Sequence, residues 1–109
     1  MQPFEVRMTA DAVRDLEEIV DWIVRHDGPA RAQHVLDRIQ KALDGLKRFP
    51  ERGSHPAELA ALGIREYRET FFKPYRIVYH VDGARVFISL IAEGRRDMRS
   101  LLARRLLAG

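Results

Sequence analysis

The chain has 109 residues, no cysteine and a net charge of +3, a length typical of one domain, so we expect a single domain over residues 1–109. Without cysteine there can be no disulfide, thiolate nucleophile or cysteine-ligated zinc, and the four histidines lack metal-site spacing, so we expect no metal and no other cofactor. No apolar run approaches 18 residues and the first residues do not resemble a signal peptide, which favours a cytoplasmic protein without a membrane anchor.

The first elements expected are a short strand and a helix. Residues 4–8 alternate apolar and polar side chains, as in a strand with Phe4 facing the core. Thr9 is placed to cap a following helix, and Asp11 suits its first turn. Apolar residues then recur every three or four positions to about Arg25, and Trp22 beside that stripe is expected to be a core or helix–helix contact.

A second helix should follow after a sharp turn. Gly28 suits the end of the first helix and Pro29 suits the first turn of the next, which the apolar pattern extends towards Phe49-Pro50. A link this short makes the two helices antiparallel. Residues 50–63 then form the one long irregular stretch, in which Ala57–Leu62 favours a turn of helix.

Three strands and a last helix complete the expected order. Strands are predicted over Arg65–Phe71, Pro74–His80 and Arg85–Ile91, and the Asp82-Gly83 pair favours a type I′ turn between the last two. Asp97 is expected to cap a basic, leucine-rich helix that reaches Leu107. The order β-α-α-β-β-β-α predicts an α+β fold with a largely antiparallel twisted sheet, a helical hairpin on one face and a short C-terminal helix.

Positive charge is concentrated in the second part of the chain. Residues 1–64 hold 9 basic and 11 acidic residues, whereas residues 65–109 hold 10 and 5. Such an asymmetry favours contact with a nucleic acid or an acidic protein. Because cations need solvent or an anionic partner, we expect a target-binding or anion-binding surface from the basic residues on the strands and their ends: Arg65, Arg68, Lys73, Arg76, Arg95 and Arg96.

Two residues near these arginines are candidates for proton transfer. If Tyr75, Ile77 and Tyr79 pack under the helices, Arg76 and His80 point to the opposite face, where the imidazole could act in acid–base chemistry. Glu93 lies beside Arg95 and Arg96 in sequence and could serve as a base, although neutralising them is the simpler role. The last helix most simply closes the core, and its apolar side could also accept a partner helix.

Five blocks of the sequence follow one another in this order: Ala12-x-x-Asp15-Leu16-x-x-Ile19, Phe49-Pro50-x-x-Gly53, Arg65-Glu66, Pro74-Tyr75-Arg76-Ile77-Val78-Tyr79 and Gly94-Arg95-Arg96-Asp97. Together they resemble the RelE/ParE superfamily of toxins from type II toxin–antitoxin systems, over nearly the whole chain. The resemblance implies a small cytoplasmic toxin that is blocked by a cognate antitoxin protein.

The superfamily has two branches with different targets. The resemblance implies either a RelE-like endoribonuclease that cuts mRNA on the ribosome or a ParE-like inhibitor that poisons DNA gyrase. No tyrosine follows Tyr79 and no histidine follows His80, so the usual C-terminal acid of the nuclease branch is missing. We therefore favour the ParE-like branch, with no catalytic residue. The alternative, a nuclease, would rely on Arg76, His80, Glu93, Arg95 and Arg96, and a third possibility is an inactive relative that acts only as a co-repressor.

The partners that follow from this hypothesis are an antitoxin and DNA gyrase, or the ribosome and mRNA in the alternative, with DNA reached only through the antitoxin. The antitoxin is expected to cover the basic surface with carboxylates and to bury its leucines on the helical hairpin or beside the last helix. The residues expected to bind it there are Met98, Leu101, Leu102, Arg105 and Leu106.

Overall fold

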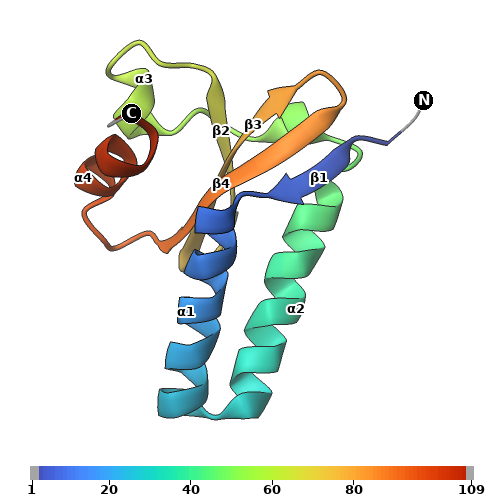
Figure 1. The fold of residues 1–109 in the computed structure, drawn as a ribbon, viewed down its shortest axis with the longest axis vertical. Coiled ribbons are helices and arrows are strands. Elements are labelled where there is room, and N and C mark those ends of the chain that lie inside the picture. The colour runs from blue at the N-terminus through green and yellow to red at the C-terminus, as the bar shows by residue number, and fades with distance from the viewer. Residues whose placement is uncertain (1–2, 108–109) are drawn as a thin grey trace.

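The computed structural model describes residues 3–107 and confirms the predicted α+β fold (Figure 1). Its elements follow the expected order, with a short additional helix before the second strand. The elements are β1 (Glu5–Met8), α1 (Ala10–Asp27), α2 (Pro29–Gly45), a 3₁₀ turn (Pro50–Arg52), α3 (Ala57–Ala60), β2 (Tyr67–Phe72), β3 (Tyr75–Asp82), β4 (Arg85–Glu93), α4 (Met98–Leu102) and a π-helical turn (Ala103–Leu107).

The four strands form one sheet in the order β1-β4-β3-β2. Strands β2, β3 and β4 are antiparallel neighbours, and β1 pairs in parallel with the first half of β4, from Glu5 opposite Arg85 to Met8 opposite Ile88. The sheet is therefore largely antiparallel, as predicted. Because β1 ends at Met8, no strand from residues 3–107 lies beside the second half of β4 on that side, and α1 passes there instead.

The helical hairpin covers one face of the sheet. Thr9 caps α1 as predicted, its hydroxyl accepting a hydrogen bond from the amide of Ala12 at 3.1 Å. Gly28, at φ 92°, separates the two helices, and Pro29 begins α2. The core beneath this hairpin contains Ile23, Val35, Ile39, Leu43, Ile77, Tyr79, Val86, Ile88 and Ile91.

A second, smaller core lies on the opposite face of the sheet. There α3 and α4 pack on Val78, Leu90 and Ala92, with Leu59 from α3 and Met98, Leu101 and Leu102 from α4 all buried. The predicted role of the last helix in closing the core is confirmed. Arg76 and His80 also belong to this face, since they alternate along β3 with Ile77 and Tyr79.

Two local predictions were wrong. Trp22 is 53% exposed, because the inward stripe of α1 runs through Ile19 and Ile23. The β3–β4 turn has a positive φ at Gly83, and no other residue in the described turn has one, which matches a type II′ and not a type I′ turn. The last helix extends to Leu107 as predicted, but it is α-helical for only five residues and then widens into a π turn.

The π turn coincides with an ion pair to α1. Arg105 donates two hydrogen bonds to the carboxylate of Asp15, at 2.8 and 2.9 Å, and a third to the carbonyl oxygen of Ser89 at 3.0 Å. The same carboxylate accepts the amide of Ile91 at 3.0 Å. Asp15 thus accepts a backbone amide of β4 beyond the end of β1 and also holds the π turn against α1.

A close contact between the long loop and the sheet explains Gly53. The hydroxyl of Tyr79, buried in the sheet, donates to the carbonyl oxygen of Pro50 at 2.5 Å. A Cβ atom on Gly53 would lie 2.6 Å from the carbonyl oxygen of Glu69 and closer still to the Tyr79 hydroxyl. Glycine is needed here for space, because its φ of −66° is open to any residue.

We predict that Gly53→Ala lowers the free energy of unfolding by roughly 1–3 kcal/mol, because the methyl group must displace backbone or break the Tyr79–Pro50 hydrogen bond. Urea denaturation measures this. Gly45→Ala is the matched control, since a Cβ there meets nothing within 4 Å and the residue closes α2, so it should be neutral or slightly stabilising. Equal midpoints for the two variants would contradict this account of Gly53.

Candidate interaction surface

Arg76 lies at the centre of an ion-pair network. Its two terminal nitrogens donate to the two carboxylate oxygens of Glu58 in α3, both at 2.8 Å, and its Nε donates to Glu69 in β2 at 2.7 Å. The side chains are 14%, 25% and 6% exposed, so the network is largely shielded from water. Each of the three guanidinium nitrogens of Arg76 therefore donates a hydrogen bond to a carboxylate of the chain itself.

The network shifts the ionisation of its members. Hydrogen bonds from Arg76, against the opposing effect of burial, lower the pKa of Glu58 from 4.5 to about 2. The two carboxylates in turn raise the pKa of Arg76 above its ordinary value. Sequence reasoning assigned no role to Glu58 or Glu69; the alternation of β2 places Glu69 on the face of Arg76, but no local pattern indicates that Glu58 reaches them.

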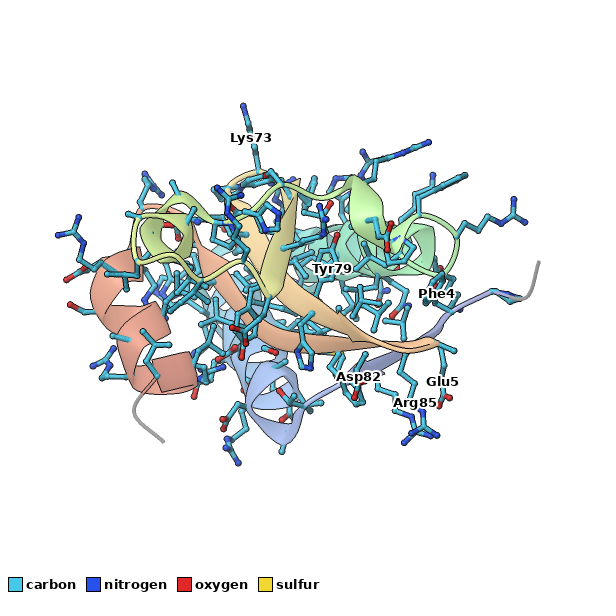
Figure 2. All side chains as sticks on the ribbon, turned by 90° about the horizontal axis from the view of Figure 1, so that it is seen from above. Phe4, Glu5, Lys73, Tyr79, Asp82 and Arg85 are labelled. Carbon is cyan, nitrogen blue, oxygen red and sulfur yellow. The ribbon has the colours of Figure 1, made fainter. Side chains whose placement is uncertain are left out.

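The structure brings together three of the six predicted basic residues at one end of the sheet. Lys73, in the β2–β3 turn, projects into solvent (Figure 2), and the amide of Gly94 donates to the carbonyl of Pro74 in that turn at 2.7 Å. This contact holds the segment with Arg95 and Arg96 beside the turn. Both arginines are exposed, and Arg95 is paired with Glu93. We call Lys73, Arg95 and Arg96 the basic end.

Other candidates lie away from the basic end. Arg65 is exposed before β2, at the opposite end of that strand. Arg68 faces the helical hairpin side and donates to the carbonyl oxygens of Glu51 and Gly53, at 3.0 and 2.8 Å, so it holds the long loop. His80 is four residues from Arg76 along β3, about 13 Å away.

His80 lies within an aromatic row that crosses three strands. It stacks on Phe87 of β4, and Tyr67 of β2 meets its edge. Its Nδ1 is buried and has no hydrogen-bond partner among residues 3–107. The strand register places His80 opposite Phe87 and Glu93 opposite Tyr75, so the imidazole lies away from Glu93 and the basic end, and the five residues of the nuclease alternative do not form one cluster.

The residues expected to bind an antitoxin are mostly inside the protein. Met98, Leu101 and Leu102 are buried in the second core, and Arg105 is held by Asp15. Leu106 packs partly against that core. Contact through these residues stays a prediction, and contact through the buried Met98, Leu101 and Leu102 would require the last helix to move.

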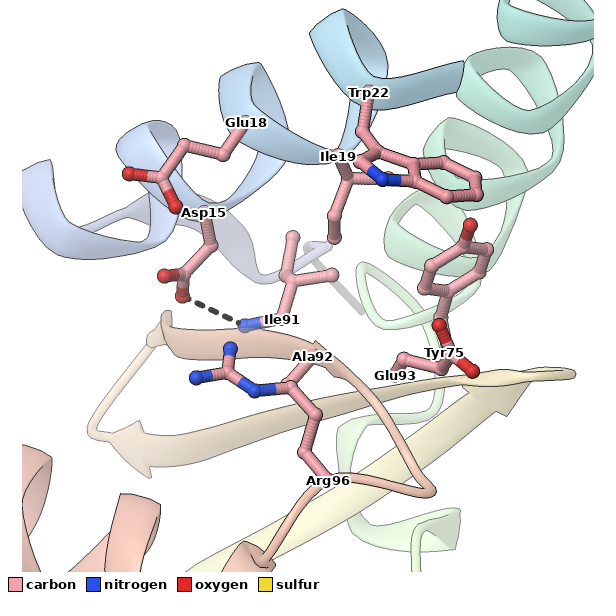
Figure 3. A pocket seen from close by; sticks show the side chains of 9 residues that line it. All are labelled: Asp15, Glu18, Ile19, Trp22, Tyr75, Ile91, Ala92, Glu93 and Arg96. Atoms are coloured by element: carbon pink, nitrogen blue, oxygen red, sulfur yellow. Dashed lines mark hydrogen bonds between the residues drawn. The ribbon is translucent and has the colours of Figure 1, made fainter. Parts of the chain in front are cut away.

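A pocket opens where α1 passes the uncovered half of β4 (Figure 3). Its volume is about 330 Å³, and α1, the start of β3 and the end of β4 supply its walls. Trp22 and Tyr75 lie on one side, and the Arg96 side chain extends back along Ile91 on the other. The lining residues are Asp15, Glu18, Ile19, Trp22, Tyr75, Ile91, Ala92, Glu93 and Arg96.

Residues 3–107 contain no group of three or more histidine and carboxylate side chains placed to hold a metal ion. Nor does any helix in that range have the length and apolar character to cross a membrane. The surface as described offers an exposed basic end and an aromatic pocket, which are suited to binding a macromolecule.

We predict that Glu58→Gln lowers stability by about 2 kcal/mol near pH 7, and that this difference disappears in acid. Glu58 has a lower pKa in the folded chain than in the unfolded chain, so its ion pair stabilises the fold above pH 4.5 and that contribution is lost as the pH falls towards 2. Denaturation at several pH values measures the difference. Glu66→Gln, which changes an exposed carboxylate of the same region, should show none; a pH-independent difference for Glu58→Gln would contradict the ion-pair explanation.

Known proteins similar to this chain share its fold and much of its length. The family model for the ParE toxin of the type II toxin–antitoxin system parDE matches residues 6–98. Toxin ParE3 of Caulobacter vibrioides is 26% identical over 91 residues, which cover 84% of this chain and 87% of the relative.

Two solved structures are also similar. One, described as the chromosomal ParDE system from P. aeruginosa, has a TM-score of 0.70 and 22% identity and covers 83% of this chain and 95% of its own. The other is the toxin–antitoxin complex RelBE2 from Mycobacterium tuberculosis, with a TM-score of 0.58, 26% identity and coverages of 85% and 93%. Because the family model spans most of the sequence, the chain belongs to the ParE family of toxins of type II toxin–antitoxin systems.

Proposed function

We propose that this ParE-family toxin inhibits growth by binding and poisoning DNA gyrase, and that a cognate antitoxin neutralises it. Membership of the ParE family supports this target more than any other. The basic end supports it independently, because Lys73, Arg95 and Arg96 are exposed on one edge, where cations can steer and hold an acidic partner. Cytoplasmic action, and a role in plasmid stabilisation, belong to the same proposal.

The single observation that favours binding over cleavage is that Arg76 is hydrogen-bonded to two carboxylates of the chain itself. A nuclease of the alternative kind would use this arginine to hold the scissile phosphate, but its donors already face Glu58 and Glu69. His80 is about 13 Å along the strand and Glu93 is paired with Arg95. General acid–base catalysis needs groups within hydrogen-bond reach of one reacting site, which this arrangement does not favour.

The nuclease remains the second candidate because of one comparison. The RelBE2 complex resembles this chain in fold and is 26% identical to it. In that case Arg76 would have to leave Glu58 when RNA binds. An inactive co-repressor is a third possibility, which expression of the chain alone would reveal by leaving growth unchanged.

A supercoiling assay with purified gyrase tests the proposed target. We predict that the chain inhibits supercoiling, and that Lys73→Ala/Arg95→Ala inhibits roughly tenfold less well, because two exposed cations are lost from the contact. Arg25→Ala, which removes an exposed cation from the far end of α1, should inhibit as the unchanged chain does.

Unchanged supercoiling at molar excess of the chain would contradict the gyrase proposal. Mapping mRNA 5′ ends after induction then separates the remaining candidates. New cuts within translated frames, lost in Arg76→Ala, would assign the nuclease function, and intact mRNA with unaffected growth would assign the inactive relative.

A further inference from the structure

The pocket beside β4 contains a large aromatic side chain that the fold does not bury. Trp22, the one tryptophan of the chain, is 53% exposed although it lies next to the buried stripe of α1. With Tyr75 and Arg96 it makes a set of tryptophan, tyrosine and arginine around one cavity. These three residue types are the most enriched among the side chains that contribute most to protein–protein binding.

The size of the pocket favours a side chain as its occupant. At about 330 Å³ it lies at the lower limit of small-molecule sites, which run from about 300 to 1,000 Å³. It is also partly open to solvent, so a side chain of a bound segment can enter it. One apolar side chain can pack against Ile19, Trp22 and Ile91 there.

The charges of the pocket indicate the chemistry of that segment. Asp15 is already satisfied by Arg105 and the Ile91 amide, and Glu93 is paired with Arg95. Arg96 makes no ion pair with any residue from 3 to 107, and its guanidinium lies within the pocket (Figure 3). Glu18 also lines the cavity, but its carboxylate points away from Trp22 and Tyr75.

We propose that this pocket receives an anchor of the antitoxin, in which an apolar side chain packs on Trp22 and a neighbouring carboxylate pairs with Arg96. The inference rests on the proposed neutralisation by an antitoxin and specifies its site. An acidic segment also suits residues 65–109, with their excess of cations. This site differs from the buried face of the last helix, and occupying it requires no change in the fold.

Binding of the protein encoded next to this chain's gene, purified and titrated against the chain, tests the proposal. We predict that Trp22 emission changes on binding and that Trp22→Ala and Arg96→Glu each weaken binding at least tenfold. Both residues are exposed, so the thermal midpoints of the variants should stay near that of the unchanged chain. The controls are Val13→Ala and Arg99→Glu, which change an exposed apolar and an exposed basic residue outside the pocket.

The charge pair is tested by reversal. Arg96→Glu should recover binding when one antitoxin Asp or Glu is changed to Arg, and no recovery at any acidic position of the antitoxin would overturn the proposed pair.

Equal affinities for the unchanged chain and both pocket variants would overturn the site while leaving the proposed function intact. No binding by the unchanged chain would contradict the proposed neutralisation itself. Self-association of the chain that Trp22→Ala abolishes would assign the pocket to a second copy and overturn the proposal.

Discussion

The guanidinium of Arg76 is the group on which one side of the molecule depends. It joins β3 to β2 through Glu69 and to α3 through Glu58, and thereby closes the smaller core over Val78 and Leu90. Gly94 allows the stem of Arg76 to pass, since a Cβ there would lie 3.2 Å from its Cδ. Removing either carboxylate would leave a shielded cation short of a partner, which destabilises a protein far more than losing a surface ion pair.

A second charged contact fastens the other edge. Asp15 accepts hydrogen bonds from both the amide of Ile91 and the Arg105 guanidinium, so the last helix is tied to α1 as well as to the sheet. Between them the two contacts engage Arg76 and Arg105 and leave the cations of the basic end exposed. Arg76 and Arg105 therefore stabilise the fold, whereas the arginines of the basic end are available to a target or an antitoxin.

Local chemistry made much of the fold predictable. The alternation in β3 placed Ile77 and Tyr79 under the helices, and Thr9 and Asp97 were recognised as caps from their positions. The partners of Arg76 and Arg105 were not predictable, because Glu58 is 18 residues and Asp15 is 90 residues away in sequence. Trp22 was misplaced because a residue beside an apolar stripe can face either side, and only packing decides. The sequence therefore predicted all three residues of the basic end, but it also grouped with them Arg65, Arg68 and Arg76, which the structure places elsewhere.

The most direct test of this account is an NMR spectrum of the arginine side chains. With Nε–H signals assigned, the signal of Arg76 should exchange slowly with water and stay unmoved during titration with inorganic phosphate, because Glu69 accepts its Nε–H and Glu58 holds its terminal nitrogens. The signal of exposed Arg96 should exchange fast and shift with phosphate. A phosphate-dependent shift at Arg76, comparable to that at Arg96, would show that the network opens to anions and would contradict the structural role assigned to it.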